Sequence, residues 1–164
     1  MPPLDLRLPF DEPYRIPEHT AAAIKRARSK DRRIIAIGTT VVRALESAAN
    51  ADGSVRSGDG VARGRIGRET PLRVADAILT GVHQPGESHF ELLRAFADDA
   101  VLEQMSDALA RVGYRPHEFG DSMLIERCSR RPVPSTPIEV GAVEASELAC
   151  PSRRRSVTQR ARMT

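Results

Sequence analysis

The hydrophobic positions of the chain fall into short continuous runs separated by segments with a helical repeat. Ile34 to Ile37 is a continuous apolar run that stops at Gly38, which predicts a buried central strand. A strand-like run covers residues 74–82, and a third, shorter one covers residues 123–125. No apolar run exceeds four residues, so we expect neither a membrane-spanning helix nor a secretory signal.

Four segments between these runs have helical patterns. A run of alanines follows Pro17, a residue that suits a first helical turn. Ser88 stands at the capping-box distance from Glu91, and Gly113 is a typical residue just after a helix. The apolar repeat Val101, Met105, Ala108 and Val112 predicts the buried face of the last helix. The predicted helices cover residues 20–28, residues 39–49, a segment from residue 88, and residues 101–112.

Strands that alternate with helices predict an α/β protein with a small, mostly parallel sheet flanked by helices. The proline-rich residues 1–17 are expected to be an extended lead-in, and residues 50–67 a surface loop. From about Arg127 onward no period persists and prolines recur. We therefore predict an α/β unit over residues 1–126 and a Pro/Arg-rich disordered tail over residues 127–164.

Charge is distributed unevenly along the 164 residues. The net charge is +3 and the pI about 9.3, but residues 148–164 contain five arginines and no acid. Residues 1–147 therefore carry 20 bases and 22 acids, a net charge of −2, and the basic pI belongs to the tail. Such a tail would give nonspecific RNA affinity that is lost on deleting residues 151–164. The two cysteines cannot form a disulfide scaffold, which favours a cytoplasmic protein.

Two segments contain residues suited to chemistry. Gly38, Thr39 and Thr40 lie between a strand and a helix, where backbone amides and hydroxyls bind a phosphate, carboxylate or ribose. The alternative is that they only cap the helix. The loop from His117 to Ser122 holds an imidazole and two carboxylates, an acid–base cluster. Its alternative is a turn in which Asp121 bonds its own backbone.

Other polar groups give weaker signals. Arg43 and Glu46 lie three residues apart on a predicted helix. They either pair with each other on the surface, or one of them faces Gly38, Thr39 and Thr40, which we call the Gly38 corner. His83, Ser88 and His89 surround a turn, but no G-x-S-x-G motif supports a hydrolase. The spacing of the histidines and Cys128 fits no common metal site, and neither G-x-G-x-x-G nor a phosphate loop occurs.

Five of these segments, taken in order, resemble the S-adenosylmethionine:tRNA ribosyltransferase-isomerase family of queuosine biosynthesis. They are YRIPE at 14–18, IIAIGTT at 34–40, RALES at 43–47, DAILTGVHQP at 76–85 and FGDSMLI at 119–125. Short motifs kept in register over about 110 residues are a far more specific signal than any one of them.

The resemblance implies a partial α/β domain that lacks the small β-barrel inserted in family members. The implied reaction transfers the ribosyl part of S-adenosylmethionine to a deazaguanine base in tRNA and rearranges it to epoxyqueuosine. It implies S-adenosylmethionine as co-substrate, no metal, tRNA as partner, no membrane contact, and a missing N-terminal half or a homo-oligomer as protein partner. By position it makes Gly38, Thr39, Thr40, Arg43 and His117 binding residues and His83, Glu118 and Asp121 catalytic candidates.

The chain also departs from the family pattern. Residues 81–88 read GVHQPGES where the family usually has N-F-H-L-P-K-S-T, so a lysine is replaced by Gly86 and a serine by Glu87. The family's serine after Gly-Thr-Thr is Val41. These changes keep open an alternative function, a truncated, non-catalytic domain that binds a nucleotide-like ligand, tRNA or a partner chain.

Overall fold

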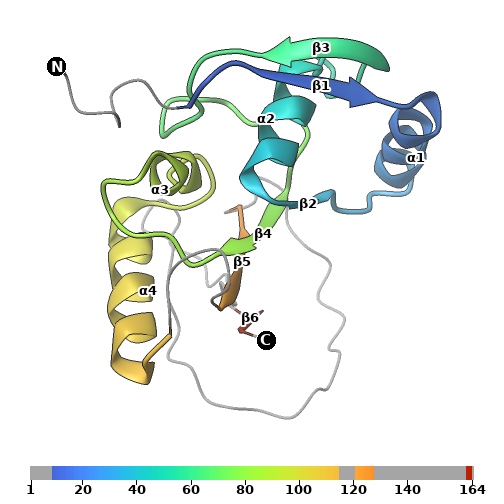
Figure 1. Ribbon diagram of the computed structural model, residues 1–164. Coiled ribbons are helices and arrows are strands. Elements are labelled where there is room, and N and C mark those ends of the chain that lie inside the picture. The colour runs from blue at the N-terminus through green and yellow to red at the C-terminus, as the bar shows by residue number, and fades with distance from the viewer. Residues whose placement is uncertain (1–8, 115–120, 128–161, 164) are drawn as a thin grey trace, which may run out of the picture.

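A computed structural model describes residues 9–114, 121–127 and 162–163 of the chain. These residues form an α/β structure with two separate sheets (Figure 1). The strands are β1 (Glu12–Ile16), β2 (Ile35–Ile37), β3 (Gly58–Ala62), β4 (Ala77–Gly81), β5 (Ser122–Glu126) and β6 (Arg162–Met163). The helices are α1 (Glu18–Ser29), α2 (Thr39–Ser47), α3 (Ser88–Leu93) and α4 (Asp99–Val112). The α/β class predicted from the sequence is confirmed.

The larger sheet has the strand order β2-β4-β5-β6 and mixed directions. Only β2 and β4 are parallel, whereas β5 runs antiparallel to both β4 and β6. The expectation of a mostly parallel sheet is therefore wrong in this respect. The reason is that two consecutive helices, α3 and α4, separate β4 from β5, and β5 starts beside the residue where β4 ends, with Ser122 opposite Gly81.

Strand β2 lies at the edge of this sheet and is not a buried central strand. Ala36 is buried, but Ile35 is 46% and Ile37 is 70% exposed. Successive side chains of a strand point to opposite faces, so Ala36 enters the core and its two neighbours face outward. The apolar run correctly predicted a strand, but not its place in the sheet.

The smaller sheet pairs β1 with β3 in antiparallel register, from Glu12 opposite Ala62 to Ile16 opposite Gly58. The extended lead-in thus ends as a strand, and the predicted surface loop contains another. Gly60 lies opposite Tyr14, and a Cβ atom at Gly60 would come within 2.5 Å of the tyrosine ring. A glycine that reads as a turn signal in the sequence is therefore needed here because an aromatic ring packs against the backbone.

Helix α2 lies between the two sheets and contributes to two hydrophobic cores (Figure 1). Its Val42 packs with the larger sheet and with α3 and α4, where Ile78, Leu93 and Leu102 are almost fully buried. Its Leu45 packs instead with Ile24 of α1 and with β1. Because the same helix joins both cores, its first turn has a fixed position relative to both sheets.

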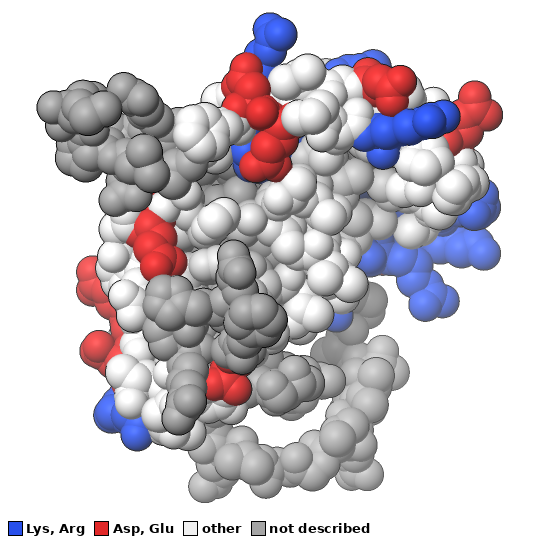
Figure 2. Space-filling view, in the orientation of Figure 1, with Lys and Arg blue, Asp and Glu red and all other residues white. Residues whose placement is uncertain are grey.

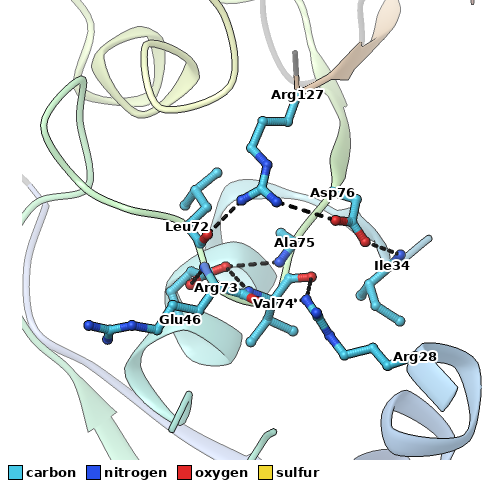
Figure 3. Close-up of polar contacts among 9 residues, drawn as sticks. All are labelled: Arg28, Ile34, Glu46, Leu72, Arg73, Val74, Ala75, Asp76 and Arg127. Atoms are coloured by element: carbon cyan, nitrogen blue, oxygen red, sulfur yellow. Dashed lines mark hydrogen bonds and ion pairs between the residues drawn. The ribbon is translucent and has the colours of Figure 1, made fainter. Parts of the chain in front are cut away.

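The segment that leads into β4 is held by side chains from three other parts of the chain (Figure 3). The Glu46 carboxylate accepts hydrogen bonds from the backbone N–H groups of Arg73, Val74 and Ala75 at 2.7–3.0 Å. Arg28 donates to the carbonyls of residues 73 and 74, and Arg127 to that of residue 72. Asp76 in turn accepts from the Ile34 N–H. We call residues 72–76 the clamped segment.

The helices agree with the sequence patterns except at two details. Ser88 is the first residue of α3 and not its cap, and no side chain caps this helix. The predicted face of α4 is displaced by about one residue, because Leu102, Met105 and Leu109 are buried whereas Val112 is 70% exposed. Gly113 ends α4 with φ +82°, as predicted.

The tail prediction falls mostly on residues 128–161 and 164, which lie outside the described residues. Arg162 and Met163 form the short strand β6 beside β5, which the sequence pattern did not predict. Among the helices of the described ranges, none is long and apolar enough to cross a membrane.

Candidate functional site

Gly38 and Asp121, one residue from each of the two segments singled out in the sequence, lie at the same end of the larger sheet. Gly38, just after β2, donates its N–H to the Leu79 carbonyl of β4 at 2.8 Å. On the other side of β4, Val82 donates its N–H to the Asp121 carbonyl at 3.1 Å. Gly38 and Asp121 therefore flank the end of β4, about 10 Å apart at two strand spacings. Ligands of α/β sheets bind at the carboxyl ends of the strands.

The Gly38 corner leaves the first turn of α2 without a side-chain cap. Gly38 has φ +91° and ψ 151°, a conformation that favours glycine, and Thr39 is already helical. Gly38 is thus the N-cap residue of α2, as the capping alternative expects, but neither threonine hydroxyl caps the helix. Thr39 is half-buried and Thr40 is exposed, so the free amides and both hydroxyls of this turn lie near the surface.

A small pocket opens between this corner and α3, with about 30 Å³ of volume open to water-sized molecules. Thr39, Ser88 and His89 line it together with charged residues of both signs. His83, the candidate chosen from the sequence, does not line it. The lining residues are Pro9, Glu12, Thr39, Arg43, Arg65, Ile66, Ser88, His89, Glu91 and Leu92.

His83 lies beside His89, and their tilted rings have centroids 5.0 Å apart. The Nε2 atom of His83 is 2.9 Å from the Thr80 hydroxyl, and its Nδ1 atom is 3.7 Å from a Glu87 carboxylate oxygen. Burial lowers the pKa of His83, and the neighbouring His89 lowers it further, whereas Glu87 raises it. Glu87, which replaces a serine of the family pattern, thus has a defined contact in this chain.

We expect the His89→Gln substitution to raise the pKa of His83, because it removes the neighbouring charge while burial continues to oppose protonation. The measurement is an NMR titration of the His83 ring. His19→Gln, at an exposed position on α1, is the control and should leave the His83 titration unchanged. An unchanged His83 pKa in the His89 variant would show that the two rings are not coupled.

The lowered pKa of His83 also determines whether stability rises or falls with pH. The unfolded chain protonates His83 at a higher pH than the folded chain, so the free energy of unfolding decreases as pH falls through the ordinary histidine pKa. The His83→Gln variant should lose this part of the pH dependence.

Arg43 and Glu46 do not pair with each other. Arg43 is 4% exposed, donates to Glu12 at 2.7 Å and also donates to the carbonyls of Phe10, Ala62 and Gly64. These bonds tie α2 to the β1–β3 sheet, while Glu46 faces the clamped segment. Both side chains are thus engaged within the protein, although Arg43 also borders the pocket.

The distal acid–base loop can be placed only in part. Asp121 lies at the sheet end described above, whereas His117 and Glu118 lie outside the described residues. Within the described ranges, no group of three or more His, Cys, Asp or Glu side chains is arranged to hold a metal ion.

Pattern reasoning missed the position of His89. The sequence does contain a signal for it, because a residue in the first turn of a helix that follows a strand end faces the ligand side of an α/β sheet.

Comparison with known proteins gives consistent matches. The family described as queuosine biosynthesis protein matches residues 7–125. A protein named S-adenosylmethionine:tRNA ribosyltransferase-isomerase from Deinococcus radiodurans is 41% identical over 116 residues, 71% of this chain and 32% of that protein. Its namesake from Thermus thermophilus is 44% identical over 115 residues, 70% of this chain and 33% of that protein.

A solved structure agrees with these matches. The crystal structure of an S-adenosylmethionine tRNA ribosyltransferase from Thermotoga maritima superposes with a TM-score of 0.61 at 30% identity. The superposition covers 69% of this chain and 40% of that protein. The chain spans about a third of the length of the curated relatives it matches.

Proposed function

Because this chain belongs to the queuosine biosynthesis protein family, we propose that it takes part in transferring the ribosyl group of S-adenosylmethionine to a deazaguanine base in tRNA. The transferred ribose then rearranges to give epoxyqueuosine, with release of adenine and methionine. The observation that carries the proposal is the convergence of the Gly38 corner, the His83–His89 pair and Asp121 at one end of the sheet. These groups come from motifs far apart in the sequence.

The proposed chemistry needs two proton-transfer groups. The sulfonium of S-adenosylmethionine acidifies the adjacent ribose carbon, so a base must lie near that carbon, and the departing adenine needs a proton donor. A lowered pKa keeps His83 neutral at neutral pH, which is the state of a proton acceptor. His89, which lines the pocket and neighbours His83, is placed to exchange protons with a bound substrate. Glu118 and Asp121 remain further candidates for these roles.

The Gly38 corner is suited to hold the co-substrate. The free amides of the first turn of α2 form the positive end of a helix dipole, which favours a carboxylate or a hydroxyl oxygen. Thr39 and Thr40 add two hydroxyls, and Arg43 holds this turn against the smaller sheet. We propose His117 as a further binding residue by its position in the family pattern.

One observation favours a second candidate function, that of a truncated, non-catalytic binding domain, which we call the binding half. Ligand pockets commonly measure about 300–1,000 Å³, whereas the pocket beside Thr39 has about 30 Å³. An adenosyl group would need walls supplied by further polypeptide, either the remaining two thirds of the relatives' length or a second copy of this chain. In that case the chain binds a nucleotide-like ligand, tRNA or a partner chain but does not catalyse the ribosyl transfer by itself.

Adenine release from S-adenosylmethionine in the presence of precursor-containing tRNA separates these candidates. We expect release by the full chain, with a reduction of about 10²-fold or more in the His83→Gln and His89→Gln variants. The His19→Gln control should retain the rate of the unaltered chain. Binding of S-adenosylmethionine in calorimetry without adenine release would favour the binding half. If the chain neither bound S-adenosylmethionine nor released adenine, both candidate functions would be contradicted.

A further inference from the structure

A dense group of positive charges lies at the end of α1 and in the turn that follows it. Six of the nine residues from 25 to 33 are lysine or arginine, and only Asp31 among them is acidic. Lys and Arg gather on the same side of the molecule in the space-filling view, below the β1–β3 sheet where Figure 1 places α1 (Figure 2). We call Lys25, Arg26, Lys30, Arg32 and Arg33 the basic turn; all five are exposed.

The backbone of the basic turn is fixed by hydrogen bonds. Asp31 adopts φ +52°, and its N–H donates to the Arg28 carbonyl at 3.0 Å. The Arg32 N–H donates to the Ala27 carbonyl at 2.9 Å. These two bonds form a Schellman motif, which here has an aspartate at the left-handed position usually taken by glycine. The side chains on either side of Asp31 therefore project from a defined backbone.

Most of the cations between residues 25 and 33 have no hydrogen-bond or ion-pair partner among the residues that the structure describes. Arg28 and Arg33 are engaged, Arg28 with the clamped segment and Arg33 with Glu126. In the part of the chain that the structure describes, the charged groups of Arg26, Lys30 and Arg32 form no hydrogen bond or ion pair. The helix dipole stabilises the charge of Arg26 in the last turn of α1. This interaction decays beyond the helix end, where Lys30 and Arg32 lie.

The opposite charge gathers elsewhere. Helix α4 carries Asp99, Glu103 and Asp107 with one base, Arg111, and acidic side chains mark its side of the molecule in Figure 2. Among the described residues, the exposed cations of the basic turn therefore lie away from the acids of α4, of which Asp99 is paired with Arg68 and Arg94. A large polyanion would approach the basic side and be repelled from α4.

We propose that the basic turn binds the phosphate backbone of RNA. The inference rests on the proposed function for the identity of that RNA as tRNA and adds the surface that would hold it. Arg33 and Gly38 lie at opposite ends of β2, about 15 Å apart for an extended chain. An RNA helix is wide enough to contact the basic turn while a nearby unpaired base reaches the pocket. The basic turn then supplies affinity, and the sheet end supplies the chemistry.

Fluorescence anisotropy of a labelled RNA hairpin with the full chain tests this inference. We compare the triple variant Arg26→Gln, Lys30→Gln, Arg32→Gln with the control triple variant Arg15→Gln, Arg63→Gln, Arg111→Gln, which removes the same charge elsewhere. Loss of three phosphate contacts should weaken binding about tenfold or more at low salt and reduce the slope of log affinity against log salt by about 2–3. The control should change the affinity less than about threefold.

Two further arms separate other sources of binding. Replacing Arg153, Arg154 and Arg155 by glutamine measures the tail, and the effect of the basic turn should persist in that background. Vesicles of phosphatidylglycerol test for a membrane surface instead of RNA. The inference would be overturned if both triple variants lost the same RNA affinity, or if the unaltered chain bound no RNA. It would also be overturned if vesicle binding, but not RNA binding, depended on the basic turn. If adenine release continues in any of these cases, the proposed function stands and only this surface is wrong.

Discussion

Replacing Glu46 with alanine is expected to lower the free energy of unfolding by about 3–4 kcal/mol. Its carboxylate accepts three backbone N–H groups of the clamped segment, and Val74 and Ala75 are fully buried. The substitution leaves these amides without an acceptor, and water cannot replace it at the two buried positions. Urea unfolding of the full chain measures the loss.

Two variants keep this prediction falsifiable. Glu46→Gln retains one carbonyl oxygen as an acceptor, so its loss should be smaller than that of the alanine variant. Glu103→Ala, at an exposed position on α4, should change stability by less than about 0.5 kcal/mol. If Glu46→Ala were as stable as Glu103→Ala, the clamped segment would not depend on this carboxylate. Because the clamped segment leads into β4, loss of the Glu46 hydrogen bonds should also displace the end of β4 that precedes His83.

Replacing Arg43 with methionine is expected to lower the free energy of unfolding by about 2–4 kcal/mol. Methionine fills much of the same space, but it leaves the Glu12 carboxylate and three carbonyls without their donor. The partial exposure of Glu12 keeps the loss below that expected for a fully buried ion pair. Arg43→Lys should recover only part of the loss, since an ammonium does not reproduce the fork of the guanidinium.

Arg15→Met is the matched control for Arg43, because its partner Asp59 lies 3.8 Å away and both side chains are more than 80% exposed. This control should cost little. If Arg43→Met matched the control in stability but abolished binding of S-adenosylmethionine, Arg43 would be a ligand-holding residue. The binding role given to it by the family pattern would then outweigh the structural role argued from its contacts.

The sequence pattern predicted local structure better than the position of each element in the fold. Apolar content located β2, but whether Ile37 faces a core or solvent depends on what lies beside the strand, which no local pattern contains. Strand β3 was missed because its stability comes from pairing with β1, more than 40 residues earlier. Gly60 illustrates this, since its requirement appears only when the Tyr14 ring is placed against it.

The candidate site was predicted in part for a similar reason. The Gly38 corner and Asp121 lie at the same edge only because β5 is antiparallel to β4; before a parallel β5, Asp121 would lie at the opposite edge, so the strand-end rule alone does not predict this convergence. The spacing of the histidines did not show that His89, and not His83, lines the pocket, although the place of His89 in the first turn of α3 was a signal for it. Arg43 and Glu46 were expected either to pair on the surface or to turn one member toward the Gly38 corner; each meets a partner distant in sequence, and Arg43 also borders the pocket.

The central claim is that the end of the larger sheet, around the Gly38 corner and His89, receives the adenosyl group of S-adenosylmethionine. Chemical-shift mapping of the full chain by NMR tests it most directly. Addition of S-adenosylmethionine should shift the resonances of Gly38, Thr39, Thr40, Ser88 and His89 and leave those of α4 unchanged. Shifts confined to α4 or to the β1–β3 sheet, or no shifts at saturating ligand, would contradict the claim.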